Sequence, residues 1–223
     1  MSPPLFQNHS TSECTIDCNV FLVYNNITIY FRDSISLSPE IIIISQGRDE
    51  MPNDYLNSVN LNSESNFPYL CMDIEKGKSI PEPPGFNVMH WHEDFQFIYV
   101  MDGELYLHTL DQTKIVPAGQ GVFLNKNVVH LVLASSDCHY KSFLFPEQLV
   151  SFYPGSPAAK YVKQIVDCKQ ITCLQFDPVN PWQDRVLERL KELSNIDADS
   201  AVCYEYEILS LLVALWLELA KNI

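Results

Sequence analysis

The chain has 223 residues, 47% of them hydrophobic, which suffices for one large domain or for a domain with a helical appendage. Its 28 acidic and 14 basic residues give a formal net charge of -14 at pH 7, so the chain by itself repels a polyanion and is not expected to bind nucleic acid. The seven cysteines are odd in number and include no CxxC pair, which argues against a zinc ribbon and favours reduced thiols in the cytoplasm.

Residues 1–65 are predicted to form a strand-rich extension that ends in a loop. The N-terminus lacks a basic start followed by an apolar stretch, so no secretory signal is visible. The segment NVFLVYNNITIYF predicts two paired strands with a tight turn at Asn25-Asn26, because asparagine tolerates positive φ. Residues 40–44 predict a buried strand, and the polar residues 45–66, which show no periodicity, predict a long loop.

Residues 66–150 are predicted to form the centre of the fold. Short segments rich in β-branched and aromatic residues alternate there with turn formers: PYLCMDI, HWHEDFQFIYV, ELYLHTL, TKIV, GVFL, VVHLVLA and HYKSFLF. The connections are too short for crossover helices, which favours an antiparallel β-barrel or jelly roll.

Residues 151–223 are predicted to be helical. A short helix is expected after Ser156-Pro157, and a second one begins at Asn180-Pro181, where Gln183 could reach back to the cap. A third helix is expected over residues 201–221; its most apolar tract is shorter than the about 20 residues that a membrane span needs. Strands followed by helices give an α+β fold class. The last two helices are more apolar than packing on a sheet requires, which predicts a homodimer.

The stretch HWHEDFQ, residues 90–96, is the best candidate for a functional site. In an extended strand its even-numbered side chains share one face, and His130 on a later strand could join them. Tyr106 and His108 also share a face with each other, although the register that would place them is not fixed by the sequence. The candidate ligand-binding residues are therefore His90, His92, Asp94, Gln96, Tyr106, His108 and His130.

Two groups of residues in this region resemble the two cupin motifs. The first motif is a glycine, a His-x-His, an acid four residues on and a closing glycine, and the second is a glycine, a Pro-x-Gly turn and a histidine. The residues that carry the resemblance are Gly85, His90, His92, Gln96 and Gly103, then Gly119, Asn125, Asn127 and His130. The interval of residues 104–118 is similar to that of microbial cupins.

Residues 67–222 as a whole resemble the sensor domain of AraC-family bacterial transcription regulators. The run HWHEDFQFIYVMDGELYLHTLDQTKIVPAGQGVFLNKNVVH carries this resemblance, together with SFLFPEQLV and CYEYEILSLLVALWLELAKN. It implies a cupin-type domain that binds a small polar effector, a sugar among the candidates, and that dimerises through residues 180–195 and 201–221. DNA would be bound only by a helix-turn-helix domain beyond Ile223. The resemblance implies neither an enzyme nor a membrane partner.

Three interpretations of the histidine cluster stay open. Gln96 stands where metal-binding cupins usually have glutamate, and a neutral amide oxygen is a poorer metal ligand than a carboxylate. We therefore favour a pocket for a small polar molecule over hydrogen-bonded strand residues without function, or over a divalent metal held by His90, His92, Gln96 and His130. No resident cofactor and no catalytic residue is expected. The alternative function is a metal-dependent cupin enzyme, an oxygenase or isomerase, with an open coordination position.

Overall fold

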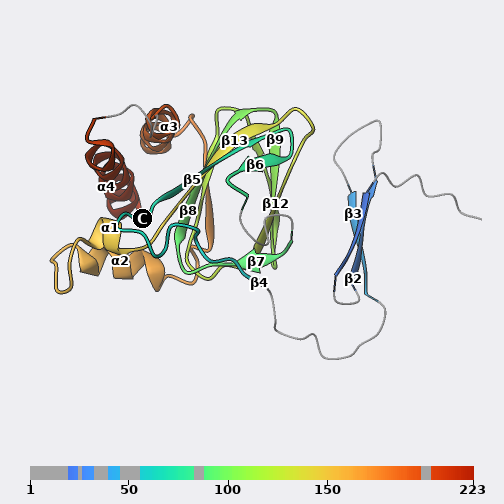
Figure 1. Cartoon of the computed structure of the whole chain (residues 1–223), viewed down its shortest axis with the longest axis horizontal. Coiled ribbons are helices and arrows are strands. Elements are labelled where there is room, and N and C mark those ends of the chain that lie inside the picture. Colours follow the sequence, from blue (N-terminus) through green and yellow to red (C-terminus); the bar gives the residue numbers. More distant parts are fainter. Residues whose placement is uncertain (1–19, 25–26, 33–39, 46–55, 83–87, 197–201) are drawn as a thin grey trace, which may run out of the picture. The chain divides into compact units, whose positions relative to one another are not determined.

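The computed structural model describes residues 20–24, 27–32, 40–45, 56–82, 88–196 and 202–223 (Figure 1). The chain divides into two compact units, residues 1–53 and 54–223. In the first unit β1 (Val20–Tyr24), β2 (Ile27–Arg32) and β3 (Glu40–Ser45) form an antiparallel sheet in the order β1-β2-β3. The predicted pair of strands and the third strand are thus confirmed, whereas the Asn25-Asn26 turn lies outside the described residues.

The second unit contains a five-stranded sheet, in the order β10-β9-β12-β7-β4, and a six-stranded sheet, in the order β14-β11-β8-β13-β5-β6. The strands are β4 (Leu56–Asn57), β5 (Leu70–Glu75), β6 (Lys78–Ile80), β7 (His90–Trp91), β8 (Phe95–Asp102), β9 (Glu104–Thr109), β10 (Thr113–Pro117), β11 (Gly121–Leu124), β12 (His130–Ala134), β13 (His139–Phe145) and β14 (Cys173–Phe176). Paired strands are antiparallel, except that β4 runs parallel to β7.

An apolar interior lies between these two sheets. Leu105 and Leu107 of β9 and Val132 of β12 pack in one cluster with Ile98 and Val100 of β8. Each of these side chains is at least nine-tenths buried, and burying one such side chain contributes about 1.5–3 kcal/mol. Aliphatic side chains therefore fill most of the space between the two sheets, and along each strand they alternate with side chains that face the other way.

Four helices follow this β core among the described residues, and they cover the outer face of the six-stranded sheet (Figure 1). They are α1 (Gln148–Ser151), α2 (Ala159–Val166), α3 (Pro181–Ser194) and α4 (Tyr204–Asn222). Phe95 and Phe97 of β8 face these helices, and the ring centroids of Phe95 and Trp216 lie 4.6 Å apart. An antiparallel β core followed by helices confirms the predicted α+β class. No helix of the described part combines the length and the apolar character that a membrane crossing requires.

The N-termini of α2 and α3 differ in part from the predicted ones. Asn180 caps α3 as expected, since its side chain accepts a hydrogen bond from the backbone N–H of Trp182 at 3.4 Å. The predicted reach of Gln183 back to this cap is wrong, because its Oε1 accepts from the backbone N–H of Asp177 and closes the preceding turn. The first predicted helix begins later than Ser156-Pro157, at Ala159, and Ser156 Oγ accepts from the N–H of Ala158.

Candidate functional site

The stretch HWHEDFQ does not form one continuous strand. β7 ends at Trp91 and β8 begins at Phe95, so the chain crosses between them from the five-stranded to the six-stranded sheet. The predicted unbroken alternation from His90 to Gln96 is therefore wrong. His90 and Gln96 lie on different sheets. A bend in the chain, and not a shared face of one strand, brings their side chains toward the same place.

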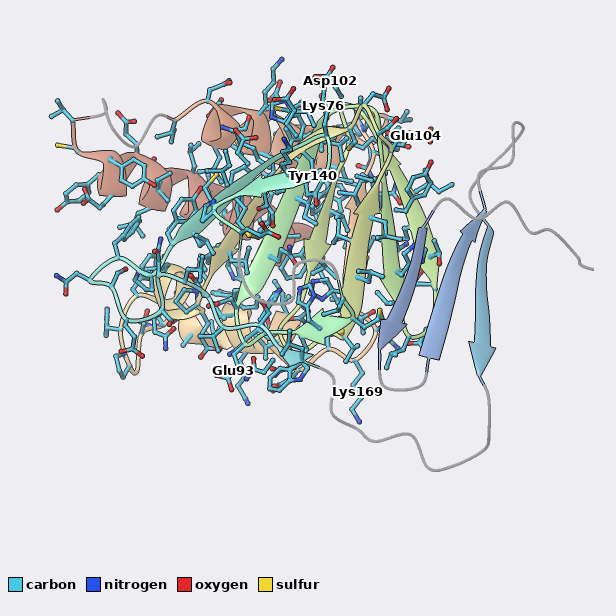
Figure 2. The ribbon with its side chains drawn as sticks, turned by 45° about the vertical axis from the view of Figure 1, so that its right-hand side comes forward. Lys76, Glu93, Asp102, Glu104, Tyr140 and Lys169 are labelled. Carbon is cyan, nitrogen blue, oxygen red and sulfur yellow. The ribbon has the colours of Figure 1, made fainter. Side chains whose placement is uncertain are left out.

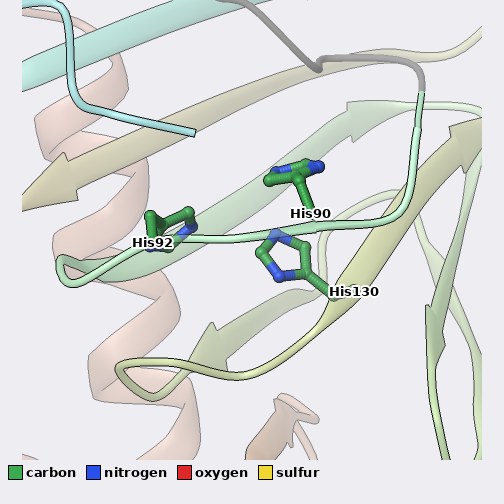
Figure 3. A group of neighbouring side chains, drawn as sticks. All are labelled: His90, His92 and His130. Carbon is green, nitrogen blue, oxygen red and sulfur yellow. The ribbon is translucent and has the colours of Figure 1, made fainter. Parts of the chain in front are cut away.

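Three histidines converge at this bend (Figure 3). His130 opens β12 and is the direct pairing partner of His90 on β7. The ring centroid of His130 lies 4.4 Å from that of His90 and 5.1 Å from that of His92. One ring nitrogen of each histidine lies within 4.8 Å of the others. The exposed fractions of His90, His92 and His130 are 8%, 2% and 0%, so the cluster is a buried one.

A backbone carbonyl fixes the Nδ1 atom of each ring. The Nδ1···O distances are 2.8 Å from His90 to Val88, 2.9 Å from His92 to Asp94 and 2.8 Å from His130 to Val128. Because a carbonyl oxygen only accepts, Nδ1 carries a proton in each ring, and the neutral ring then has a lone pair on Nε2. The same second-sphere contact orients histidines that bind metals.

Burial favours the neutral form of all three rings. It is the main cause that lowers the pKa of His90 and of His92. Burial, followed by the proximity of the other two imidazoles, lowers the pKa of His130 well below its usual range. Three neutral imidazoles therefore meet without the repulsion that three charged rings would have.

Gln96 and Ser142 extend the cluster onto the six-stranded sheet. Gln96 Oε1 lies 3.2 Å from His92 Nε2, and Gln96 Nε2 donates to Ser142 Oγ at 2.8 Å. Both residues are buried, with exposed fractions of 4% and 1%. Sequence reasoning missed Ser142, which lies 46 positions along the chain from Gln96 on β13. The available signal was a serine in the otherwise apolar strand end SFLF.

The residues present fit a divalent transition-metal ion. His130 Nε2 is buried and has no hydrogen-bond partner among the described residues. Such an unpaired buried group costs about 1–3 kcal/mol, which a ligand can recover. Three imidazole nitrogens and one amide oxygen are all acceptors, and imidazole is a preferred ligand of zinc, copper, iron and nickel. The same set also fits an uncharged ligand that donates hydrogen bonds.

The side chains of the remaining candidate residues interact with groups outside this cluster. Asp94 contributes its backbone carbonyl to His92, and burial raises the pKa of its carboxyl against an opposing hydrogen bond from Asn60. Tyr106 and His108 alternate along β9 with the two leucines of the interior, so they face outward. Their polar atoms contact Glu104 Oε2 at 3.0 Å and Thr113 Oγ1 at 2.8 Å, respectively.

The turn between β11 and β12 connects the cluster to the helical layer. Asn127 lies at the position of the glycine in the Pro-x-Gly turn and has a φ of 61°, which asparagine tolerates, and its N–H donates to the carbonyl of His92 at 2.9 Å. The buried amide of Asn125 donates to the carbonyls of Ile165 and Ile171 at 3.0 and 2.9 Å. This turn therefore contacts both the bend at His92 and the end of α2. Gly85, the first glycine of the cupin resemblance, lies outside the described residues.

Two cavities lie beside the turn between β11 and β12 and beside the short helices. One of about 300 Å³ is lined by residues 109–111, 125–129 and part of 166–172. The other, of about 440 Å³, lies between α1 and α2. Neither of these two cavities is lined by a histidine of the cluster.

More than half of the chain is similar to known proteins. Residues 83–204 match the family described as the AraC-like ligand binding domain. The chain is 24% identical over 147 residues to the uncharacterized HTH-type transcriptional regulator YdeC of Bacillus subtilis (strain 168), over 62% of this chain and 47% of that protein. The chain thus spans about half the length of the curated relative it matches.

Two solved structures illustrate the more distant likenesses. ToxT from Vibrio cholerae is 12% identical with a TM-score of 0.41, over 69% of this chain and 56% of that one. An RmlC-like cupin from Shewanella frigidimarina NCIMB 400 is 10% identical with a TM-score of 0.28, over 63% of this chain and 92% of that one. Likenesses this weak carry no argument about ligand or function.

Proposed function

This chain belongs to the AraC-like ligand-binding domain family, and from that premise we propose that it is the effector-binding and dimerisation domain of a transcription regulator. The name of its curated relative, an HTH-type transcriptional regulator, supports the proposal. The net charge of -14 agrees with a regulator in which a separate helix-turn-helix domain, and not this chain, binds DNA. In this proposal the chain works in the cytoplasm, and it binds a ligand rather than catalysing a reaction.

The effector is proposed to be small and polar and to bind at His90, His92, Gln96 and His130. The observation that carries this proposal is the unpaired Nε2 of His130 among the described residues, which points to a ligand that donates a hydrogen bond or carries positive charge. A sugar-like compound with neighbouring hydroxyls belongs to this class. Binding would then shift the population of conformations that the helical layer adopts.

A thermal-shift screen of this chain with sugars, polyols and amino acids tests the proposal. A ligand present at 100 times its Kd stabilises by about 2.7 kcal/mol, which for a chain of this size raises Tm by roughly 5–10 °C. The shift should disappear in His90→Ala and persist in His139→Ala, whose ring contacts Asp73 at 2.7 Å at the end of β13 away from Gln96. A hit that both variants retain would place the ligand elsewhere.

A metal-dependent cupin enzyme is the second candidate. The convergence of three imidazole nitrogens within 4.8 Å favours it, since three ligands leave positions open for a substrate. A bound metal would supply Lewis-acid chemistry at His90, His92 and His130. Within the described residues the cluster adds no carboxylate that could transfer a proton, which weighs against catalysis. Stoichiometric metal with turnover of an added substrate would support this candidate.

The homodimer is proposed to form through the outer side of α4. Tyr206 and Leu217 are 76% and 49% exposed, and with the half-buried Leu209 and Val213 they recur at helical spacing. An apolar stripe of this kind on a helix is typical of a contact surface.

Leu217→Glu should therefore shift the chain from dimer to monomer in analytical ultracentrifugation at micromolar concentration, because it places a charge in an apolar contact. Gln164→Glu on α2 adds the same charge at another exposed helical position and should leave the dimer intact. A wild-type chain that sediments as a monomer would contradict the proposal.

A further inference from the structure

The larger of the two cavities lies between α1 and α2, and no histidine of the cluster lines it. Its volume of about 440 Å³ is within the range of small-molecule sites. Figure 1 shows the two helices next to each other below α4. The lining contains apolar side chains of α2, among them Val162 and Val166, and two aromatic side chains from the connection between the helices, Phe152 and Tyr153.

The backbone at Phe152 is strained. This residue has a φ of 73° and a ψ of -65°, and the N–H of Tyr153 donates to the carbonyl of Ser151 at 3.1 Å. These are the features of a γ-turn of the rare, strained type. Glycine adopts a positive φ without steric cost, whereas phenylalanine does not. The sequence therefore keeps an aromatic ring at a position where the backbone favours glycine.

This γ-turn brings two neighbouring rings into the lining of one cavity. In an extended segment neighbouring side chains point to opposite sides, and the sharp turn at Phe152 removes this alternation. Phe152 and Tyr153 are 54% and 60% exposed. Packing within the chain therefore leaves about half of each ring in contact with solvent, and this surface is open to a ligand.

The charged side chains of the lining are paired. Lys163 and Asp167, one turn apart on α2, form an ion pair at 2.9 Å, and Glu147 contacts Lys126 at 3.0 Å. From α1 the lining also receives the neutral polar side chain of Gln148. The cavity thus offers no unpaired charge to a charged ligand, and its apolar surface would remove water from the ligand charge at a cost.

We propose that this cavity is a second ligand site, which binds a small uncharged aromatic compound through the rings of Phe152 and Tyr153. Aromatic rings attract one another in offset and edge-to-face contacts, and the amide of Gln148 can donate to or accept from one polar group of the compound. The site goes beyond the proposed function, because it does not use the histidines. Val162 of the lining also belongs to the apolar cluster that contains Trp216, so the site is continuous with the packing of α4, the helix of the proposed dimer.

Isothermal calorimetry with 2-naphthol, which is uncharged at neutral pH, tests the site. The wild type should bind one 2-naphthol per chain, and Phe152→Ala and Tyr153→Ala should each weaken binding by about 10-fold or more, the size of one lost ring contact. 2-Naphthoate has the same rings and a negative charge, so it should bind about 10-fold more weakly or worse. Tyr161→Ala, which removes an exposed ring of α2 outside the lining, and His90→Ala should bind 2-naphthol like the wild type.

Phe152→Gly separates a ligand-binding role of this ring from a structural one. Glycine relieves the strain of the γ-turn, which offsets the partial burial that is lost with the ring, so Tm should stay within about 4 °C of the wild type. The binding of 2-naphthol should weaken as much as in Phe152→Ala. A fall in Tm of about 10 °C or more would show that the ring stabilises the fold, which contradicts a ring kept for a ligand.

Three other results would overturn the inference. Absence of 2-naphthol binding, or binding that both Phe152→Ala and Tyr153→Ala retain, would show that the cavity does not take this class of compound. Equal affinity for 2-naphthoate would contradict the selection of an uncharged ligand. Loss of binding in His90→Ala would place the compound at the histidine cluster. The proposed function is tested separately, because its thermal-shift screen depends on His90 and not on Phe152.

Discussion

His130→Leu is expected to leave the ligand-free chain within about 1 kcal/mol of wild-type stability and to abolish ligand binding at the cluster. The substitution removes a buried Nε2 that has no partner among the described residues, which recovers about 1–3 kcal/mol. It also deprives the carbonyl of Val128 of its Nδ1–H donor, with a cost of similar size. Leucine suits the apolar interior, because Val132 on the same strand face already packs there.

Urea unfolding with and without Zn²⁺ measures both halves of this prediction. At 100 times its Kd the ion should add about 2.7 kcal/mol to the free energy of unfolding of the wild type and nothing to that of His130→Leu. Leu107→Ala is the matched control, since this fully buried side chain of the same interior should cost about 2–5 kcal/mol without a ligand. If ligand-free His130→Leu lost a comparable part of its free energy of unfolding, the role of His130 would be to stabilise the fold.

The same variant should flatten the acid limb of the stability curve. Burial lowers the pKa of His130 in the folded chain, whereas the unfolded chain titrates at about 6.5. The contribution of the neutral ring to the free energy of unfolding is therefore fully present above about pH 6.5. As the pH falls below about 6.5, the free energy of unfolding decreases by up to about 1.4 kcal/mol per pH unit for each such histidine. Removing one ring should make the fall from about pH 7.5 to 5.5 shallower.

The strands of the β core could be predicted from sequence because their side chains alternate between two apolar layers. Phe95 and Phe97 face the helices while Ile98 and Val100 face the other sheet, as the alternation along β8 predicts. β14 was missed, because Cys173–Phe176 is a short segment between helices and gains its partner only by pairing with β11. Such an edge strand is defined by tertiary contact rather than by local pattern.

The three members of the histidine cluster were predictable from the sequence, but the geometry of the cluster was not. Spacing and resemblance identified the three histidines, yet the break at residues 92–94 leaves no trace in the alternation of polar and apolar residues. The outward direction of Tyr106 and His108 could have been inferred, since Leu105 and Leu107 occupy the interior face of the same strand. Ser142 could not, because nothing local pairs a serine of β13 with Gln96.

Gly103→Ala is expected to destabilise the chain by about 2–4 kcal/mol, the sum of a backbone cost and a steric one. Gly103 joins β8 to β9 with a φ of +72°, which an alanine adopts at a cost of about 1 kcal/mol. An added Cβ would also lie 2.7 Å from the Cα of Cys138 and 2.8 Å from Ser135 Oγ. Because the first of these atoms is backbone, relief requires the β12–β13 turn to move.

Gly77→Ala separates the two costs. Gly77 has a similar φ of +77°, but a Cβ there would meet no atom within 4 Å, so only the backbone cost of about 1 kcal/mol is expected. Urea unfolding of both variants gives the steric part of the cost as the difference between their free energies of unfolding. Equal losses would mean that the backbone at Cys138 moves without cost.

Figure 2 shows Asp102 and Glu104, which flank Gly103, at one end of the second unit, and Glu93 of the bend at the other. Gly103 lies seven positions along the chain from Gln96, roughly 23 Å in an extended strand, so the folded fraction of Gly103→Ala should bind Zn²⁺ as the wild type does.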